Sequence, residues 1–321
     1  MKLNYIQQAY TGLHDWWRYI IGVIIAIIGV FIFSGPHMAG ILYKQFNNEL
    51  DMSRMDDTNY LLSLFEPNLN LLFMLLPFAG GLLFLIFAVK LLHKQTFKSL
   101  TTSRAKIDWK RVFSMFMVWG VFSSGLVVLD YYLSPEDYVV NFNLNKFLVL
   151  AVIAIVLVPL QTSFEEYLFR GYLMQGIGVL VKNKWVPLII TSVVFGMLHI
   201  ANPEVDKLGK VIMVYYIGTG LFLGIMTLMD KGLELALGFH AANNLFTALL
   251  VTADWTAFQT HSILKDTSEP TGAAFADIFM PVFIVFPIIL LILGRVYGWK
   301  NWKDKLFGQV EEPPKEDYKI I

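Results

Sequence analysis

Long apolar runs separated by polar connections dominate this chain. A helical membrane span needs about 20 apolar residues, and about eight runs meet that need, at residues 17–35, 69–92, 111–133, 146–180, 185–201, 211–229, 232–252 and 274–297. Open strands cannot satisfy their backbone groups in lipid, so we expect every run to be a helix. The runs therefore predict an all-α polytopic membrane protein with about eight transmembrane helices.

Composition agrees with a membrane protein. The chain is 56% hydrophobic and 16% charged, whereas soluble domains have roughly 45–50% apolar and about 25% charged residues. The net charge is zero, which argues against a nucleic-acid partner. No cysteine is present, so disulfides, thiolate catalysis and thiolate metal sites are excluded. The first apolar run is too long for a signal-peptide core, and we expect it to be a retained span.

Basic residues sort to one side of the predicted membrane. Lysines and arginines gather in the second, fourth and sixth connections and after residue 295, whereas the loops at 36–68, 134–145 and 253–273 are acidic. The positive-inside rule then places both termini in the cytoplasm, as eight crossings require. We expect one transmembrane domain at 1–305 and a flexible cytoplasmic tail at 306–321. The lack of eukaryotic targeting features favours a bacterial plasma membrane.

The fourth apolar run is too long for one crossing. It contains Pro159, followed by the polar residues Gln161, Thr162 and Ser163. Proline removes a backbone donor from a helix, and a hydroxyl side chain can cap a new one. We therefore expect a kink, or a break followed by a second helical piece, near Pro159.

The same run carries three charges within six residues, Glu165, Glu166 and Arg170. Each charge at mid-bilayer costs roughly 2.5–3.5 kcal/mol on insertion scales, which makes this a candidate functional site. Glu166 and Arg170 are spaced i,i+4 in the orientation that favours a helical ion pair. Glu165 is turned about 100° away and has no local basic partner. Glu166 is then the structural acid and Glu165 the reactive one; the alternative is an ion pair at the membrane surface.

Two histidines, His199 and His240, lie deep inside apolar runs. If Asn183 is the tip of a helical hairpin, Glu166 lies 17 residues before it and His199 lies 16 after it. Both would sit about 25 Å from the turn. His240 lies about 13 Å along its helix from Lys231, so its depth matches less well. Either histidine alone would be read as a core residue, but beside an acid pair they favour the activation of water.

Three short motifs now stand in order: Glu165-Glu166-x-x-x-Arg170, Phe195-x-x-x-His199 and His240-x-x-x-Asn244. Together they resemble the family of CAAX-processing and bacteriocin-processing intramembrane proteases, over about residues 146–252. The resemblance implies a helical bundle around an intramembrane polar cavity, with the catalytic motifs inside that segment.

By the same resemblance, Glu165 would activate water with His199 as its partner. His240 and Asn244 would hold the oxyanion or help to form the site, and Glu166, Arg170 and Phe195 would support it. Members of the family have been described both as metalloproteases and as metal-independent glutamate proteases. Glu165, His199 and His240 would suit a catalytic zinc, and the same site works without metal.

The predicted function is an intramembrane endopeptidase that hydrolyses a peptide bond in a membrane-anchored or lipid-modified peptide or protein. No cofactor is required by the sequence, and a divalent metal such as zinc stays open. Two alternatives remain: a non-enzymatic immunity or scaffold protein of the membrane, and a transporter that uses Glu165 and Glu166 as a proton relay. Transporters often contain two similar halves, and we find no such repeat here.

Overall fold

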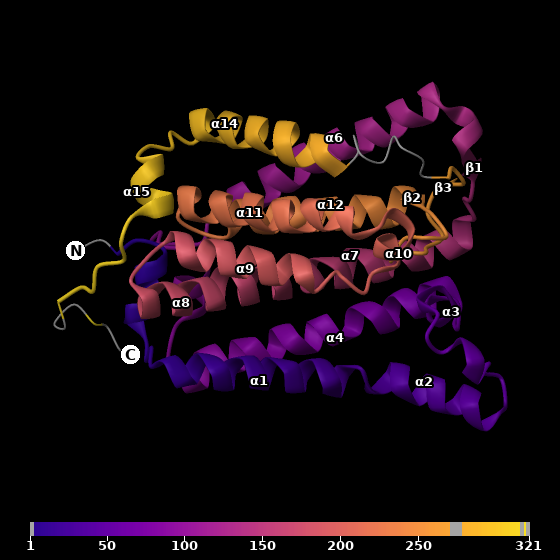
Figure 1. Cartoon of the computed structure of the whole chain (residues 1–321), viewed down its shortest axis with the longest axis horizontal. Helices are drawn as coiled ribbons and strands as arrows, with labels where there is room; N and C mark the ends of the chain where they lie inside the picture. The colour runs from indigo at the N-terminus through magenta and orange to yellow at the C-terminus, as the bar shows by residue number, and fades with distance from the viewer. Residues whose placement is uncertain (1–2, 270–277, 315–317, 319–321) are drawn as a thin grey trace.

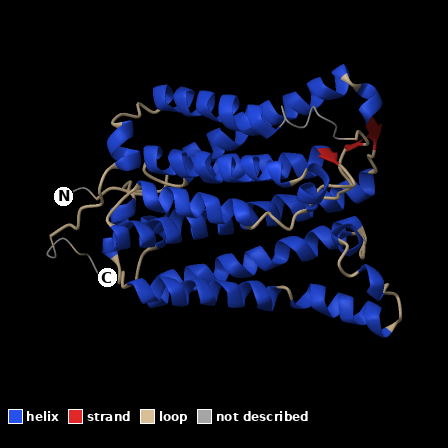
Figure 2. Ribbon diagram, viewed as in Figure 1, coloured by secondary structure: helices blue, strands red, loops and turns tan. Residues whose placement is uncertain are grey.

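The protein is a bundle of helices that lie roughly along one axis (Figure 1). The computed structural model describes residues 3–269, 278–314 and 318. Both termini lie at one end of the bundle, and the short strands lie at the other (Figures 1 and 2). We call the end with the termini the terminal end, formed by residues 93–108, 182–184, 231–233 and 297–314. The opposite end, which carries the strands, is the strand end.

In the described residues, nine helices form the body of the bundle, and others connect them or follow them. The body helices are α1 (Trp16–Phe33), α4 (Pro67–Phe87), α6 (Trp109–Leu133), α7 (Leu144–Glu166), α8 (Met174–Val181), α9 (Trp185–Met197), α11 (Met213–Asp230), α12 (Glu234–Leu250) and α14 (Phe286–Val296). The connecting helices are α2 (Gly35–Phe46), α3 (Thr58–Leu62), α5 (Phe97–Thr101), α10 (Pro203–Leu208) and α15 (Trp302–Phe307). The all-α polytopic membrane fold that the apolar runs predict is confirmed.

Six helical segments of the described chain are long and apolar enough to cross a membrane by length and composition. The other two predicted spans correspond to α9, which is apolar but shorter, and to α12, which carries His240 and Asn244. The last predicted span starts at residue 274, outside the described residues, and its described part begins at Ile278. Polar side chains thus interrupt the apolar surface of α12, which carries the third motif.

The fourth predicted span is one continuous helical segment from Leu144 to Val181. The predicted break at Pro159 is therefore wrong, since Pro159 lies inside α7. The winding changes instead in a π-helical segment, η5 (Tyr167–Leu173), directly after Glu166. Such wider turns inside helices are frequent at functional sites. After η5, α8 continues to the turn at Asn183, whose side chain accepts a hydrogen bond from the backbone N–H of Trp185 at 2.8 Å.

Three short strands close the strand end. They are β1 (Tyr138–Val140), β2 (Val251–Thr252) and β3 (Leu264–Asp266), in the order β1-β3-β2. β3 pairs antiparallel with β1 and parallel with β2. The sheet therefore ties the connection after α6 to the connection after α12.

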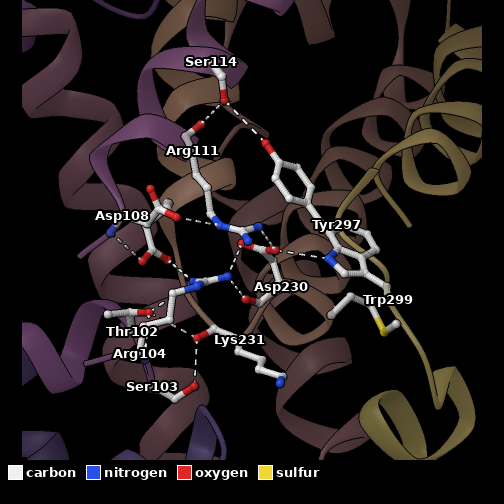
Figure 3. Close-up of polar contacts among 12 residues, drawn as sticks. Thr102, Ser103, Arg104, Asp108, Arg111, Ser114, Asp230, Lys231, Tyr297 and Trp299 are labelled. Atoms are coloured by element: carbon white, nitrogen blue, oxygen red, sulfur yellow. Dashed lines mark hydrogen bonds and ion pairs between the residues drawn. The ribbon is translucent and has the colours of Figure 1, made fainter. Parts of the chain in front are cut away.

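The terminal end is packed and charged. Tyr5, near the start of the chain, is 2% exposed, and its hydroxyl donates to the carbonyls of Leu100 at 2.9 Å and Arg170 at 3.1 Å. Nearby, Arg104 and Arg111 bind the carboxylate of Asp230 (Figure 3). These contacts fill the space between the acid motif and the terminal end.

The chain after residue 305 is also ordered by contacts, as far as it is described. Val310 is 1% exposed, and its backbone N–H donates to Lys182 O at 3.0 Å. The side chain of Gln7 donates to Glu311 O at 2.8 Å. Within the described part of the predicted tail, Leu306 and Val310 are buried, whereas most of their neighbours are exposed, and the flexible tail over 306–321 stays a prediction.

Candidate active site

Glu166 and Arg170 form the buried ion pair that their spacing predicts. Both side chains are 0% exposed, and Arg170 Nη1 lies 3.1 Å from Glu166 Oε1. Arg170 Nη2 donates to the carbonyl of Gly220 on α11 at 3.2 Å. The guanidinium also lies 4.1 Å from the ring centroid of Phe195 on α9. One arginine thus connects α7, α9 and α11 at the level of the acid motif, and the alternative of a surface ion pair does not hold.

His240 lies between the two acidic side chains. Its Nδ1 is 2.8 Å from Glu166 Oε1, and its Nε2 is 3.4 Å from Glu165 Oε2. A carboxylate oxygen only accepts, so Nδ1 carries the proton that is donated to Glu166. This contact fixes the ring orientation and turns Nε2 toward Glu165. The first and third motifs therefore meet directly, although depth counted along the sequence matched His240 less well than His199.

His199 belongs to the same cavity but is held by other groups. Its Nδ1 is 2.9 Å from the carbonyl of Phe195, one turn earlier. Its ring stacks on Tyr216, with centroids 4.4 Å apart. Glu165 and His199 both line one cavity. A carbonyl accepts, so Nδ1 is the protonated nitrogen here and Nε2 is left to interact with a molecule in the cavity.

Gln161 is a site residue that the motif analysis did not single out. Its Nε2 donates to Glu165 Oε1 at 2.7 Å, and its Oε1 accepts from Asn244 Nδ2 at 3.2 Å. Gln161 therefore joins the reactive acid to the third motif. Its i,i+4 spacing before Glu165 is the sequence feature that could have identified it as a site residue. Asn243 accepts from Trp119 Nε1 at 3.1 Å and donates to Asn244.

The candidate active site opens into a cavity of about 600 Å³. Polar residues of all three motifs line it, namely Glu165, His199 and Asn244. Its walls continue to α10 and to residues 251–258 near the strand end. Apolar side chains provide much of the remaining wall: Met74, Leu75, Phe78, Phe164, Leu168, Phe169, Phe195, Leu198 and Ile212.

Charge in the acid cluster is unbalanced. Glu165 and Glu166 share one arginine, and Glu165 Oε2, Glu166 Oε2 and Arg170 Nε are buried atoms without a hydrogen-bond partner among the described residues. A buried polar atom without a partner costs free energy. Glu165 Oε2 belongs to a residue that lines the cavity, so a small polar molecule there would satisfy it.

Glu204 and Tyr216 also line the cavity and were missed by the motif analysis. Glu204 lies on α10, outside the predicted spans, so the cost of burying charge in lipid gave no signal for it. Tyr216 stacks on His199. A stacking partner of this kind comes from helix packing and leaves no spacing pattern that a single sequence would reveal.

The predicted metal ligands Glu165, His199 and His240 do not form a three-ligand group. Within residues 3–269, 278–314 and 318, no cluster of three His, Cys, Asp or Glu side chains could hold a metal ion. His240 Nδ1 faces Glu166 and His199 Nδ1 faces a carbonyl, an arrangement that is also common for histidines that bind metal through Nε2. A zinc ion at these residues therefore stays a prediction.

The segment that carries the three motifs also matches a known protein family. Residues 144–246 match the family described as Type II CAAX prenyl endopeptidase Rce1-like. The chain is also 28% identical to the protein described as "Uncharacterized protein YyaK" of Bacillus subtilis (strain 168), over 252 residues that cover 78% of this chain and 83% of that protein. No solved structure matches the chain. The Rce1-like match covers the same segment that carries the three motifs of the sequence analysis.

Proposed function

We propose that this protein is an intramembrane endopeptidase that hydrolyses a peptide bond in a membrane-anchored or lipid-modified peptide or protein. The family match supports a CAAX-type protease. The observation that carries the proposal is the state of Glu165. One of its oxygens is held by Gln161, while the other has no hydrogen-bond partner and belongs to a residue that lines the cavity. Such a carboxylate is suited to bind and deprotonate a water.

In the proposed reaction Glu165 is the general base. It takes one proton from water, and the water oxygen forms a bond to the carbonyl carbon of the peptide. When the carbon–nitrogen bond breaks, Glu165 returns the proton to the leaving amine. The water is thereby divided between the new carboxyl group and the new amino group, and no other reactant is needed. Burial near apolar walls strengthens each of these electrostatic contacts.

Three further residues would assist this reaction. His199 Nε2 is the nitrogen left free by the bond to Phe195, so it would orient the attacking water from the opposite wall. Asn244 lines the cavity and has an N–H group beyond the one given to Gln161, so it would donate to the oxyanion. His240, held by Glu166 at 2.8 Å, would stabilise the charge on Glu165 when its Nε2 is protonated as well.

Cellular placement follows from charge. The terminal end carries the basic connections and the strand end the acidic loops, so we assign the terminal end to the cytoplasm by the positive-inside rule. The protein would be a multi-pass protein of a bacterial plasma membrane. Its partners would be the bilayer and a membrane-anchored peptide or protein substrate.

Cleavage by the purified protein in detergent tests this function. The probe is a quenched fluorescent peptide that carries an acyl anchor. Glu165→Gln should lower the rate by about 100-fold or more, the range of general base catalysis, with thermal stability unchanged. Glu166→Gln should keep a measurable rate, since the amide oxygen still accepts from His240. Equal rates for wild type and Glu165→Gln would contradict the proposal and favour a scaffold. Proton uptake into liposomes that depends on Glu165 would favour a transporter.

A further inference from the structure

Glu204 places a third carboxylate on the wall of the cavity, near the strand end. It lies on α10, and its Oε1 accepts a hydrogen bond from the backbone N–H of Ala257 at 2.8 Å. Its Oε2 is a buried atom with no hydrogen-bond partner in the described chain. The carboxylate is therefore held by one oxygen while the other is left unsatisfied on the wall of the cavity.

The cavity as a whole is acidic. Three carboxylates line it, those of Glu165, Glu204 and Asp266, and no Lys or Arg among the described residues does so. The lysines of α10 and β3 are paired with acids outside the cavity wall. Lys207 Nζ lies 2.5 Å from Glu269, and Lys265 Nζ lies 2.7 Å from Asp254. The protein thus leaves the negative charge of its cavity uncompensated.

An unpaired carboxylate in such a place is unfavourable unless something compensates it. Burial raises the pKa of Glu204, and a charged His199 would lower it again. His199 donates no hydrogen bond to Glu204, since Glu204 Oε1 accepts from Ala257 and Oε2 has no partner in the described residues. An incoming cation would supply the missing partner, because a charge-assisted hydrogen bond is among the stronger polar contacts.

We propose that Glu204 forms a subsite for a positively charged group of the substrate, a lysine or arginine side chain near the bond that is cut. This inference rests on the proposed protease function and names the class of segment that enters the cavity. Trp255 Nε1, a second buried polar atom without a partner in the described residues, belongs to the same cavity wall. It would donate to a carbonyl of the bound peptide.

The same charges disfavour a segment that ends in a free carboxylate close to the cut. Such a carboxylate would meet three acidic groups and no lysine or arginine. We therefore infer that the scissile bond lies within a basic segment. Because α10 and residues 251–258 line the cavity toward the strand end, the segment would enter from the end opposite the termini.

Peptide binding by the full-length protein in detergent tests the subsite. The Glu165→Gln background prevents cleavage, and fluorescence anisotropy gives the Kd of three acylated, amidated peptides that differ at one position as Lys, Met or Glu. The lysine peptide should bind tightest. Glu204→Gln, which keeps an acceptor for Ala257, should weaken its binding roughly 10-fold or more and leave the methionine peptide unchanged. Glu204→Lys should shift the preference to the glutamate peptide.

Asp206→Asn is the matched control, because Asp206 lies on the same short helix, is exposed and does not line the cavity. It should leave all three Kd values unchanged. The subsite would be overturned if Glu204→Gln weakened the binding of all three peptides equally, or weakened none of them. A Glu204-dependent preference for lysine without cleavage by the wild type would support the subsite and count against the protease function. Cleavage without such a preference would support the protease function and count against the subsite.

Discussion

Among the described residues, two clusters of buried charge are built differently. The acid cluster comprises Glu165, Glu166, Arg170 and His240 at the cavity. The end cluster comprises Arg104, Arg111, Asp230 and Glu234 at the terminal end (Figure 3). Both contain two carboxylates from the apolar part of the chain. Only the acid cluster contributes a residue to the large cavity.

The end cluster pairs each of its carboxylate oxygens. Asp230 Oδ1 accepts from Arg111 at 2.6 Å and from Trp299 at 3.1 Å, and Oδ2 accepts from Arg104 at 2.8 Å. Glu234 Oε2 accepts from Arg104 at 2.9 Å, and Oε1 accepts from the N–H of Asp108 at 3.2 Å. Two arginines bind these two buried acids, and Arg111 also binds the partly exposed carboxylate of Asp108 at 3.1 Å. The cluster therefore joins α6, α11, α12 and the segment after α14 without a group left over for chemistry.

The acid cluster is left incomplete. Two acids share one arginine and one imidazole, and one oxygen of each acid has no hydrogen-bond partner in the described residues. A fully paired network adds rigidity, whereas a partly paired one raises the free energy of the folded state. Such a cost is retained where function requires the unpaired group. The comparison teaches that a missing partner beside a cavity, rather than buried charge as such, marks the site for chemistry.

Among the variants that test this comparison, Arg170→Met should have the largest effect, and it should act on folding stability. It leaves Glu166 as an unpaired buried charge, which typically costs about 3–5 kcal/mol of folding stability. We expect a strong loss of thermal stability in detergent and no cleavage. The double variant Glu166→Gln with Arg170→Met removes both charges and should recover most of the stability. If the single and double variants were equally unstable, the ion pair would not be the cause.

Asp230→Asn should have a smaller effect, confined to stability. Arg104 and Arg111 are 23% and 20% exposed, so water can partly replace the lost carboxylate. We expect a loss of about 1–3 kcal/mol, the range for removing one partner of a buried polar contact. The cleavage rate per folded molecule should not change. A reduced kcat in the folded fraction would show that the end cluster takes part in the reaction.

Gln161→Leu should affect the rate and spare the fold. It removes the hydrogen bond that holds Glu165 Oε1 at 2.7 Å and leaves the carboxylate free to turn. We expect kcat to fall roughly 10-fold, because misplacement of a reacting group reduces the benefit of orientation. Steady-state kinetics and a melting curve on the same sample measure both effects. Gln161→Glu provides a contrast, since it adds a third acid to the cluster.

Removal of metal should have the smallest effect. The donor set of Glu165, His199 and His240 does not converge on one point, so we expect incubation with a strong chelator to leave the cleavage rate unchanged. Metal analysis of the purified protein should find zinc at well below one equivalent. A rate that is lost with chelator and restored by zinc would show that the histidines rearrange around a metal ion.

Local spacing and hydropathy account for what was predicted correctly. The apolar runs predicted the helices because lipid leaves a backbone few alternatives. The Glu166–Arg170 pair followed from i,i+4 geometry, which depends only on the helix itself. Asn183 was recognised as the hairpin turn between two apolar runs, and the structure has the turn there.

Depth counted along the helices was a weak guide to which histidine contacts the acids. It matched His199 with Glu166 better than it matched His240. In the structure the helical run continues to Val181, 15 residues past Glu166, whereas α12 begins only six residues before His240. His240 nevertheless reaches both acids, and His199, which matched in depth, is bonded to Phe195 instead.

The sequence by itself therefore determined the membrane fold, the acid motif and the residue types of the site, since these follow from hydropathy and from contacts within one helix. Only the tertiary structure decided that His240 lies against both acids, that Gln161 holds Glu165 and that Glu204 joins the cavity. Those contacts depend on how far each helix extends and how it is rotated against its neighbours. Packing sets both quantities, and no spacing along a single chain encodes them.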